Sequence, residues 1–259
     1  MKIRMILIEK GLSFERRFVN SWTFDHFRPA YQALNPLSIV PTFVDEDGTS
    51  VIQSNVIAEY LEQRYDSPAL LPQTPALAAQ AREWMLVEQD DLFPIIVTLS
   101  FNSMMKLRVQ VFGFEKMAKW AKAFPDQDKA QDYLKRVTAP VDIKAVKLAK
   151  EKFDFHMQRL EAQLLKHDGP WVCGTQFTLA DICLAGIIDR IEYLDNADLY
   201  TRYSNVSRWY EGLKARHSFQ QGAHLFEDRM WGPLKSPEKY PYKAEPKHIW
   251  GYWNNTKQE

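Results

Sequence analysis

A polar stretch before a helix carries the residues best suited to chemistry in this sequence. Gln53 and Ser54 stand just before an apolar run with helical spacing that begins at Val56, and serine is typical of a helix N-cap. The N–H groups at the start of a helix lack partners within it and attract anions. Pro41 opens the strand upstream, and its peptide bond can be cis. We therefore predict that a small carboxylate binds where this strand meets the helix.

Two short strands and a tight turn are expected to position these residues. Residues 42–45 and 50–52 have the composition of strands, and the turn between them contains Asp47-Gly48, a sound hairpin signal. A helix is predicted over residues 55–65. The hairpin therefore leads the chain from Pro41 to the start of that helix.

The N-terminal residues predict a further helix and a further strand. Ile3, Ile6 and Leu7 share a helical face, and Gly11 is placed to end the helix. The same run is rich in β-forming residues, so a strand is an alternative there. Residues 14–20 alternate as a strand does, and residues 24–34 have helical spacing that ends before Pro36. The first part of the chain is therefore predicted to be α/β.

From residue 76 onward the pattern is helical. Residues 78–101 form a long amphipathic stretch with a predicted kink at Pro94, and a polar, basic excursion follows over residues 103–140. Further helices are predicted over residues 142–166, 178–194 and 205–216. Thr178 and Asp181 open the second of these as a T-x-x-D capping box, which is a folding device.

Three segments resemble the glutathione transferase family. The segment IVPTFVDEDGTSVIQSNVIAEYLEQRY is similar to the end of the family's thioredoxin-like half, where VP opens the third strand and an acidic or amide residue plus Ser opens the third helix. MKIRMILIEKGLSFE resembles its first helix and second strand, and TQFTLADICLAG resembles the folding motif of its helical half. Residues 188–219 are most similar to the bacterial tetrachlorohydroquinone dehalogenase-like and β-etherase-like members. The resemblance spans residues 1–226.

The resemblance implies a fold that is α/β plus all-α. A thioredoxin-like glutathione-binding domain would occupy residues 1–66, a linker residues 67–75, and an all-α domain residues 76–226. Residues 227–259 would form a tail rich in Trp, Tyr and Pro. Such a segment suits an arm on the helical half or on a partner subunit, or alternatively a lid over a substrate groove.

The resemblance also implies glutathione as cosubstrate and assigns its contacts. The backbone of Val40, held by a cis bond to Pro41, would pair with the cysteinyl part of glutathione, while Gln53 and Ser54 would bind the γ-glutamyl group. Ile39 stands where many members have Lys, Arg or Gln, so the contact to the glycine carboxylate would come from elsewhere, such as residues 22–26. Weaker candidates for a hydrophobic groove are Met104, Met105, Phe112 and Phe114, which could equally be core residues.

The catalytic residue of the family has no match in this sequence. In the family a strand and a Tyr, Ser or Cys precede the first helix, whereas here Met1-Lys2 already lies inside it. Loss of that strand would leave two strands with unpaired buried edges, at a cost of roughly 1–3 kcal/mol for each buried unpaired group. On this ground we expect a start assigned too far downstream or a truncation, rather than a degenerate relative that has lost its thiol chemistry.

The function implied by the resemblance is attack of a glutathione thiolate on a hydrophobic electrophile, aromatic or halogenated in some members. An alternative is a non-catalytic glutathione-binding module with the same fold, and a third hypothesis is an oligomeric structural protein that assembles through its tail. The family implies a homodimer formed through the first two long helices.

Composition excludes several other classes of protein. Lys plus Arg equals Asp plus Glu at 33 each, so no basic excess favours nucleic acid. The two cysteines, Cys173 and Cys183, suit neither a disulfide scaffold nor a zinc site and are expected to be buried. The six histidines have no metal-ligand spacing. These spacings predict no metal site. No signal peptide or long apolar run is present, so we expect no membrane partner and a cytosolic location.

Overall fold

The computed structural model of this chain describes residues 1–19, 25–106, 109, 112–122 and 124–223, without the side chain of residue 120. The chain divides into two compact units, Met1–Leu225 and Phe226–Glu259, and all described residues lie in the first. The tail predicted over residues 227–259 lies outside them.

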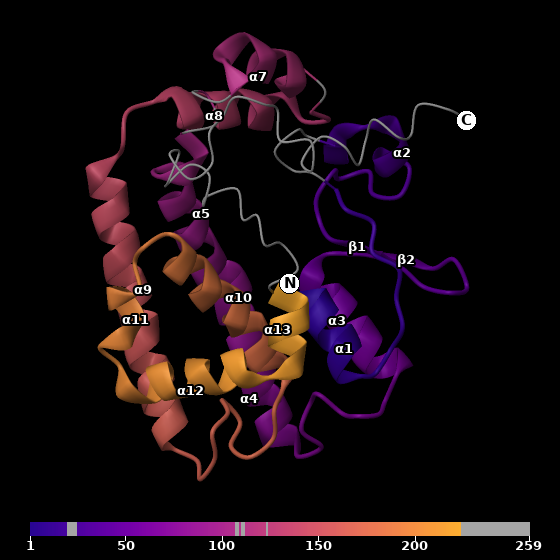
Figure 1. Cartoon of the computed structure of the whole chain (residues 1–259), viewed down its shortest axis with the longest axis vertical. Helices are drawn as coiled ribbons and strands as arrows, with labels where there is room; N and C mark the ends of the chain where they lie inside the picture. Colours follow the sequence, from indigo (N-terminus) through magenta and orange to yellow (C-terminus); the bar gives the residue numbers. More distant parts are fainter. Residues whose placement is uncertain (20–24, 107–108, 110–111, 123, 224–259) are drawn as a thin grey trace. The chain divides into compact units, whose positions relative to one another are not determined.

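Helices dominate the described residues, and Figure 1 labels most of them. In chain order the elements are α1 (Lys2–Glu9), the 3₁₀ helix η1 (Asp25–Phe27), α2 (Pro29–Gln32), β1 (Thr42–Val44), β2 (Ser50–Ile52), α3 (Ser54–Arg64), α4 (Pro75–Leu86), the π-helix η2 (Val87–Leu92), α5 (Phe93–Phe101), the 3₁₀ helix η3 (Met104–Lys106), α7 (Phe114–Ala121), α8 (Gln127–Thr138), α9 (Ile143–Leu165), α10 (Leu179–Tyr193), α11 (Asp198–Thr201), α12 (Ser204–Ala215) and α13 (His217–Ala223).

Helix α1 confirms the helical reading of the N-terminal residues. It ends in a Schellman motif, because Gly11 has a φ of 65° and the N–H groups of Gly11 and Leu12 donate to the carbonyls of Ile8 and Leu7 at 3.0 and 2.9 Å. The helix packs between α3, α10 and α13 (Figure 1). A Cβ on Gly222 of α13 would lie 2.8 Å from Met5 Cγ, so glycine permits this close approach.

The β1–β2 hairpin confirms the two strands predicted there. Thr42 pairs with Ile52, Phe43 with Val51 and Val44 with Ser50. In the turn, Gly48 has a φ of 85° and its N–H donates to the Asp45 carbonyl at 2.9 Å, which is the geometry that the Asp-Gly pair predicted.

The strand predicted over residues 14–20 is wrong for the described residues 14–19. Those residues have no regular secondary structure, and β1 and β2 are the only strands in the described part of the chain, paired with each other. A strand forms only when a neighbouring strand takes its N–H and C=O groups. Alternation in the sequence was therefore not sufficient.

The helix predicted over residues 24–34 was too long. In its place the structure has η1 and then α2, which begins at Pro29. Proline lacks an N–H and is tolerated only in the first turn of a helix, so Pro29 starts a new helix instead of continuing the earlier one.

The long helix predicted over residues 78–101 is confirmed as a helical run with an irregular centre. The π-helix η2 lies between α4 and α5, immediately before Pro94. Since Pro94 cannot donate a backbone hydrogen bond, the α-helical pattern changes just before this residue, while the kink itself stays a prediction.

The three helices predicted after residue 140 are confirmed as α9, α10 and α12, whereas α7 and α8 lie in the segment 103–140, for which no individual helix was predicted. Side-chain caps open α9 and α10. The Asp142 carboxylate accepts from the Ala145 N–H at 2.9 Å at the start of α9. Thr178 and Asp181 form the predicted capping box of α10. Asp181 is fully buried and also accepts from the Val172 N–H and from Trp209 Nε1, at 2.9 and 2.8 Å. The box therefore ties α10 to α12 and has the structural role we predicted.

Candidate functional site

The hairpin register brings the predicted binding residues together. The Val40–Pro41 peptide bond is cis, as the resemblance implied, and Thr42 of β1 pairs with Ile52 of β2. Pro41 directly precedes Thr42, and Gln53 and Ser54 directly follow Ile52. The start of β1 and the start of α3 therefore lie at one edge of the hairpin.

Val40 presents an open backbone at this edge. The residue is 48% exposed, and neither its N–H nor its C=O has a hydrogen-bond partner among the described residues. A peptide lying extended beside Val40 could donate to its carbonyl and accept from its amide, as in strand pairing.

Ser54 lies one residue inside the helix that it was predicted to cap. Gln53 is the N-cap of α3, with φ 70° and ψ 118°, and no side chain caps the helix. This backbone conformation is rare for a residue other than glycine and is a form of strain found at binding sites. Because the cap is missing, the first-turn N–H groups of α3 stay available to an anion.

A lysine from α1 reaches the start of α3. Lys2 Nζ lies 3.1 Å from Ser54 Oγ, 2.6 Å from Asn55 Oδ1 and 2.7 Å from Glu88 Oε2. Burial alone would lower the pKa of Lys2, but Cys183 and Glu88 outweigh burial and raise the pKa. Lys2 is therefore cationic, and it donates to Ser54, which leaves the hydroxyl hydrogen of Ser54 free to donate to a carboxylate.

Lys2 and Glu88 are residues of the candidate site that sequence reasoning missed. Glu88 is buried in the π-helix η2, and the adjacent Asn55 donates from Nδ2 to the Met85 carbonyl at 3.1 Å. A buried charged pair between α1 and η2 has no local sequence pattern.

Asp45 holds the hairpin against α3. Its buried carboxylate accepts from the hydroxyls of Tyr60 and Tyr65, at 2.5 and 2.7 Å. Burial alone would raise the pKa of Asp45, but the two tyrosine hydrogen bonds outweigh burial and lower it. The same contact raises the pKa of Tyr65 to about 12.

The candidate groove residues do not share one environment. Met104 is buried in η3, with its Sδ 3.3 Å from Arg190 Nη1, whereas Phe114 at the start of α7 is 52% exposed. Met105 and Phe112 are half-buried. No described cavity joins these four residues, so a groove there stays a prediction. Of the residues proposed near the glycine carboxylate, 22–24 lie outside the described part.

A pocket of about 330 Å³ lies at the other end of α1, lined by Ile8, Glu9, Arg216, His217 and Ser218. Arg216 is already paired with Glu9 through two bonds of 2.8 and 2.7 Å. This pocket therefore belongs to the contact between α1 and α13 and is separate from the Val40–Ser54 edge.

The open backbone at a cis proline, next to an uncapped helix and followed by a helical half, defines a protein of the glutathione transferase type. The family model "Glutathione S-transferase, N-terminal domain" matches residues 1–64, and "Glutathione S-transferase, C-terminal domain" matches residues 117–221. The chain belongs to the glutathione S-transferase family.

Individual relatives agree with this assignment. The chain is 27% identical over 218 residues to glutathione S-transferase F9 of Arabidopsis thaliana, covering 83% of this chain and 87% of the relative. It is 23% identical over 226 residues to the tetrachloro-p-hydroquinone reductive dehalogenase of Sphingobium chlorophenolicum, covering 85% and 89%. In fold it is similar to the β-etherase LigF of Sphingobium sp. strain SYK-6, with a TM-score of 0.76, 24% identity and coverage of 85% and 92%.

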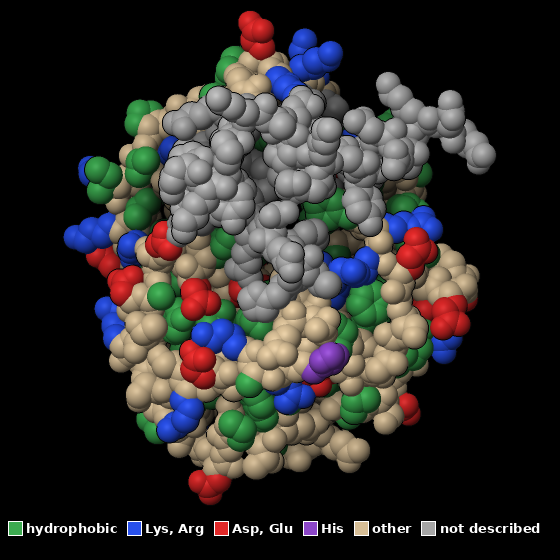
Figure 2. All heavy atoms as spheres, viewed as in Figure 1, with side chains coloured by type: hydrophobic (Ala, Val, Ile, Leu, Met, Phe, Trp, Pro, Cys, Tyr) green, Lys and Arg blue, Asp and Glu red, His purple; other side chains and the backbone are tan. Residues whose placement is uncertain are grey.

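The described residues contain no group of three or more His, Cys, Asp or Glu placed to hold a metal ion. No helix in the same part of the chain is long and apolar enough to cross a membrane. On the face drawn in Figure 2, acidic and basic side chains are interspersed around the grey atoms.

Proposed function

We propose that this protein binds glutathione along the edge from Val40 to Ser54. The supporting observation is the open backbone of Val40 opposite the uncapped, strained start of α3. The cysteinyl part of glutathione would pair with the N–H and C=O of Val40. The γ-glutamyl carboxylate would accept from Ser54 and the first-turn amides of α3, with Gln53 beside it and Lys2 supplying positive charge.

The reaction we propose is attack of the glutathione thiolate on a small hydrophobic electrophile. The thiol loses its proton to solvent, sulfur forms a bond to the electrophilic carbon, and the leaving group departs with the electron pair of the broken bond. The positive end of α1 favours a thiolate near its N-terminus, and no residue of the sequence is assigned as catalytic. The names of the transferase and dehalogenase relatives are consistent with this reaction class.

Two measurements test the proposal in sequence. Isothermal titration calorimetry with glutathione should give one site per chain with a Kd in the micromolar to millimolar range. Turnover of a chloronitrobenzene with glutathione should then release chloride and form the thioether. Binding without turnover would favour the alternative, a non-catalytic glutathione-binding module. Absence of binding would contradict both.

We also propose a homodimer through one exposed apolar face, defined by Val56, Leu86 and Phe93, which are 55%, 56% and 52% exposed. α3 and α4 lie side by side there, because Arg82 pairs with Glu59 at 2.8 Å. Large exposed apolar residues that cluster on neighbouring helices are typical of subunit interfaces. The two buried free cysteines suit the reducing cytosol, which we keep as the proposed compartment.

A further inference from the structure

Three side chains converge on the backbone next to Val40. Tyr31 Oη donates to the Ile39 carbonyl at 2.6 Å, and Asn35 Nδ2 donates to the same carbonyl at 2.7 Å. Both also bond Thr42 Oγ1, at 2.9 and 3.1 Å respectively. The three side chains, which we name the Tyr31 clamp, therefore connect α2 to the start of β1 across the Val40–Pro41 bond.

The planarity of the peptide bond gives this clamp a consequence at Val40. The Ile39 carbonyl and the Val40 N–H belong to one rigid, trans peptide group, in which they point in opposite directions. Two hydrogen bonds that fix the Ile39 carbonyl toward Tyr31 and Asn35 must therefore turn the Val40 N–H away from them. That N–H has no acceptor among the described residues.

Asn35 is itself held in place. It is fully buried, and its Oδ1 accepts from the Leu37 N–H at 3.1 Å, while the Asn35 carbonyl accepts from the Ser38 N–H at 2.9 Å. The Nδ2, Oδ1 and carbonyl oxygen of Asn35 are thus all hydrogen-bonded nearby. These contacts set the orientation of the side-chain amide. The clamp is a preformed unit that does not need a ligand to assemble.

We propose that Tyr31, Asn35 and Thr42 are positioning residues for peptide-backbone recognition, because they hold the Val40 peptide group in the direction that pairs with the cysteinyl unit of glutathione. This inference rests on the proposed function and extends it to residues that do not touch the ligand. Preorganised donors and acceptors bind more tightly because less freedom is lost on binding.

The competing interpretation is that the clamp only stabilises the fold by tying α2 to β1. That role predicts variants with a lower melting temperature but an unchanged Kd for the folded protein. The positioning role predicts a higher Kd at a temperature where every variant is folded. The dissociation constant, measured well below the melting transition, therefore separates the two.

The experiment is calorimetric titration of the full chain with S-methylglutathione, which removes thiol chemistry from the measurement. Tyr31→Phe and Thr42→Val each delete one hydroxyl of the clamp, while Thr42→Ser retains it. Tyr203→Phe is the matched control, since its hydroxyl also bonds a side chain, that of Asp154, but lies between helices of the all-α part. Thermal melting of each variant confirms that it is folded at the titration temperature.

We expect Tyr31→Phe and Thr42→Val to raise the Kd roughly three- to tenfold, the range that loss of one ordinary hydrogen bond gives. Thr42→Ser and Tyr203→Phe should stay within about twofold of the original protein, a change too small to represent a lost hydrogen bond. Unchanged Kd values for both deletions, or an equal loss in Thr42→Ser and Thr42→Val, would overturn the inference. Failure of the original protein to bind would instead overturn the proposed function, and this inference with it.

Discussion

At the scale of single residues, Ser54 and Lys2 would both contribute to carboxylate recognition in the proposed site. The lysine ammonium uses Ser54 Oγ as an acceptor, so the serine hydrogen is left for a ligand. Glu88 balances the charge of Lys2 at 2.7 Å while the pair is largely buried. The site can therefore remain ordered without glutathione and still offer donors at the start of α3.

Replacing Ser54 directly tests its proposed hydrogen bond to the carboxylate of glutathione. Ser54→Ala removes a hydrogen bond to a charged group, which contributes about 1.5–3 kcal/mol, so glutathione affinity should fall roughly ten- to hundredfold. Calorimetry measures the change. Ser50→Ala is the control, because that hydroxyl bonds the Leu34 carbonyl on the exposed outer part of the hairpin. Equal affinities of Ser54→Ala and the original protein would remove Ser54 from the site.

The two cysteines give a second prediction at this scale. Burial raises the pKa of Cys173 to about 11 and that of Cys183 to about 12, so almost no thiolate exists near neutral pH. Neither should react with a disulfide reagent in the native protein at pH 8, and both should react after unfolding in guanidinium. Fast native labelling of one equivalent would show that a thiol is accessible.

Single residues also mark the limit of prediction from sequence. Pro41 and Ser54 were found because proline and a helix start leave local patterns. Lys2 and Glu88 were missed because the contact joins residues far apart in the chain, and only the packing of α1 against α3 and η2 creates it. The open backbone of Val40 was likewise implied by resemblance, and physical pattern alone did not show it.

At the scale of elements, the site depends on the hairpin staying docked on α3. Asp45 is the main polar contact between the hairpin and α3, since its carboxylate accepts hydrogen bonds from the hydroxyls of both Tyr60 and Tyr65. Arg64 adds a longer contact of 3.7 Å. The helices were predictable because caps and apolar spacing act locally. The strand predicted over residues 14–20 was wrong for the described residues 14–19, because a strand depends on a partner that a single segment does not contain.

The Asp45 link predicts a defined pH dependence of stability. The folded-state pKa of Asp45 is lowered, so its stabilisation is present above the ordinary aspartate pKa of about 3.9 and is lost as pH falls through the folded value. The pKa of Tyr65 is raised to about 12, so its effect on stability runs in the other direction of pH. The stabilisation from Tyr65 is present below about pH 10 and is lost as pH rises toward the folded-state pKa.

Asp45→Asn measures this contribution. At pH 6 the variant should be less stable by about 1.5–3 kcal/mol, the range for hydrogen bonds to a charged group, as judged by urea unfolding. The difference should shrink below about pH 4, where Asp45 becomes protonated in the unfolded chain and then in the folded protein. Asp66→Asn, at an exposed position after α3, is the control. A difference independent of pH would contradict the assigned role of the carboxylate.

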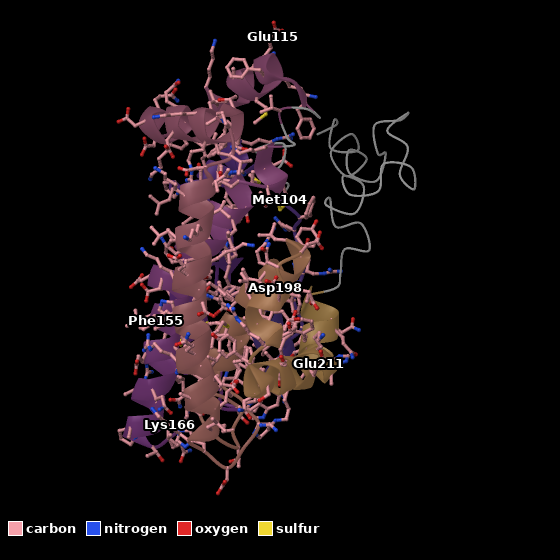
Figure 3. All side chains as sticks on the ribbon, turned by 90° about the vertical axis from the view of Figure 1, so that its left-hand side faces the viewer. Met104, Glu115, Phe155, Lys166, Asp198 and Glu211 are labelled. Carbon is pink, nitrogen blue, oxygen red and sulfur yellow. The ribbon has the colours of Figure 1, made fainter. Side chains whose placement is uncertain are left out.

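At the scale of the molecule, the exposed apolar face of Val56, Leu86 and Phe93 is the feature that the fold of one subunit does not explain. Phe155 on α9 is also exposed, at 58%, and lies on the side of α9 turned away from α11 and α12 (Figure 3). The domain boundaries near residues 66 and 76 and the groove stay predictions, and the tail lies outside the described residues.

The dimer prediction is tested by a charge on that face. Phe93→Asp should convert a dimer of about twice the 30.3 kDa chain mass into a monomer, because an unpaired carboxylate is costly in an apolar interface. Light scattering coupled to gel filtration measures the mass. Leu37→Asp, between α2 and β1 and 58% exposed, is the control. An unchanged dimer in Phe93→Asp would place the interface elsewhere, and a monomeric original protein would contradict the dimer.

The central claim is that glutathione pairs with the Val40 backbone beside the first turn of α3. The most direct test is a titration of the ¹⁵N-labelled protein with glutathione, followed through its backbone amide resonances. We expect the Val40 amide to shift downfield as it gains an acceptor, together with the amides of Asn55 and Val56, and all three to saturate with one Kd. Saturable shifts that spare these amides, or no shifts at millimolar glutathione, would contradict the account.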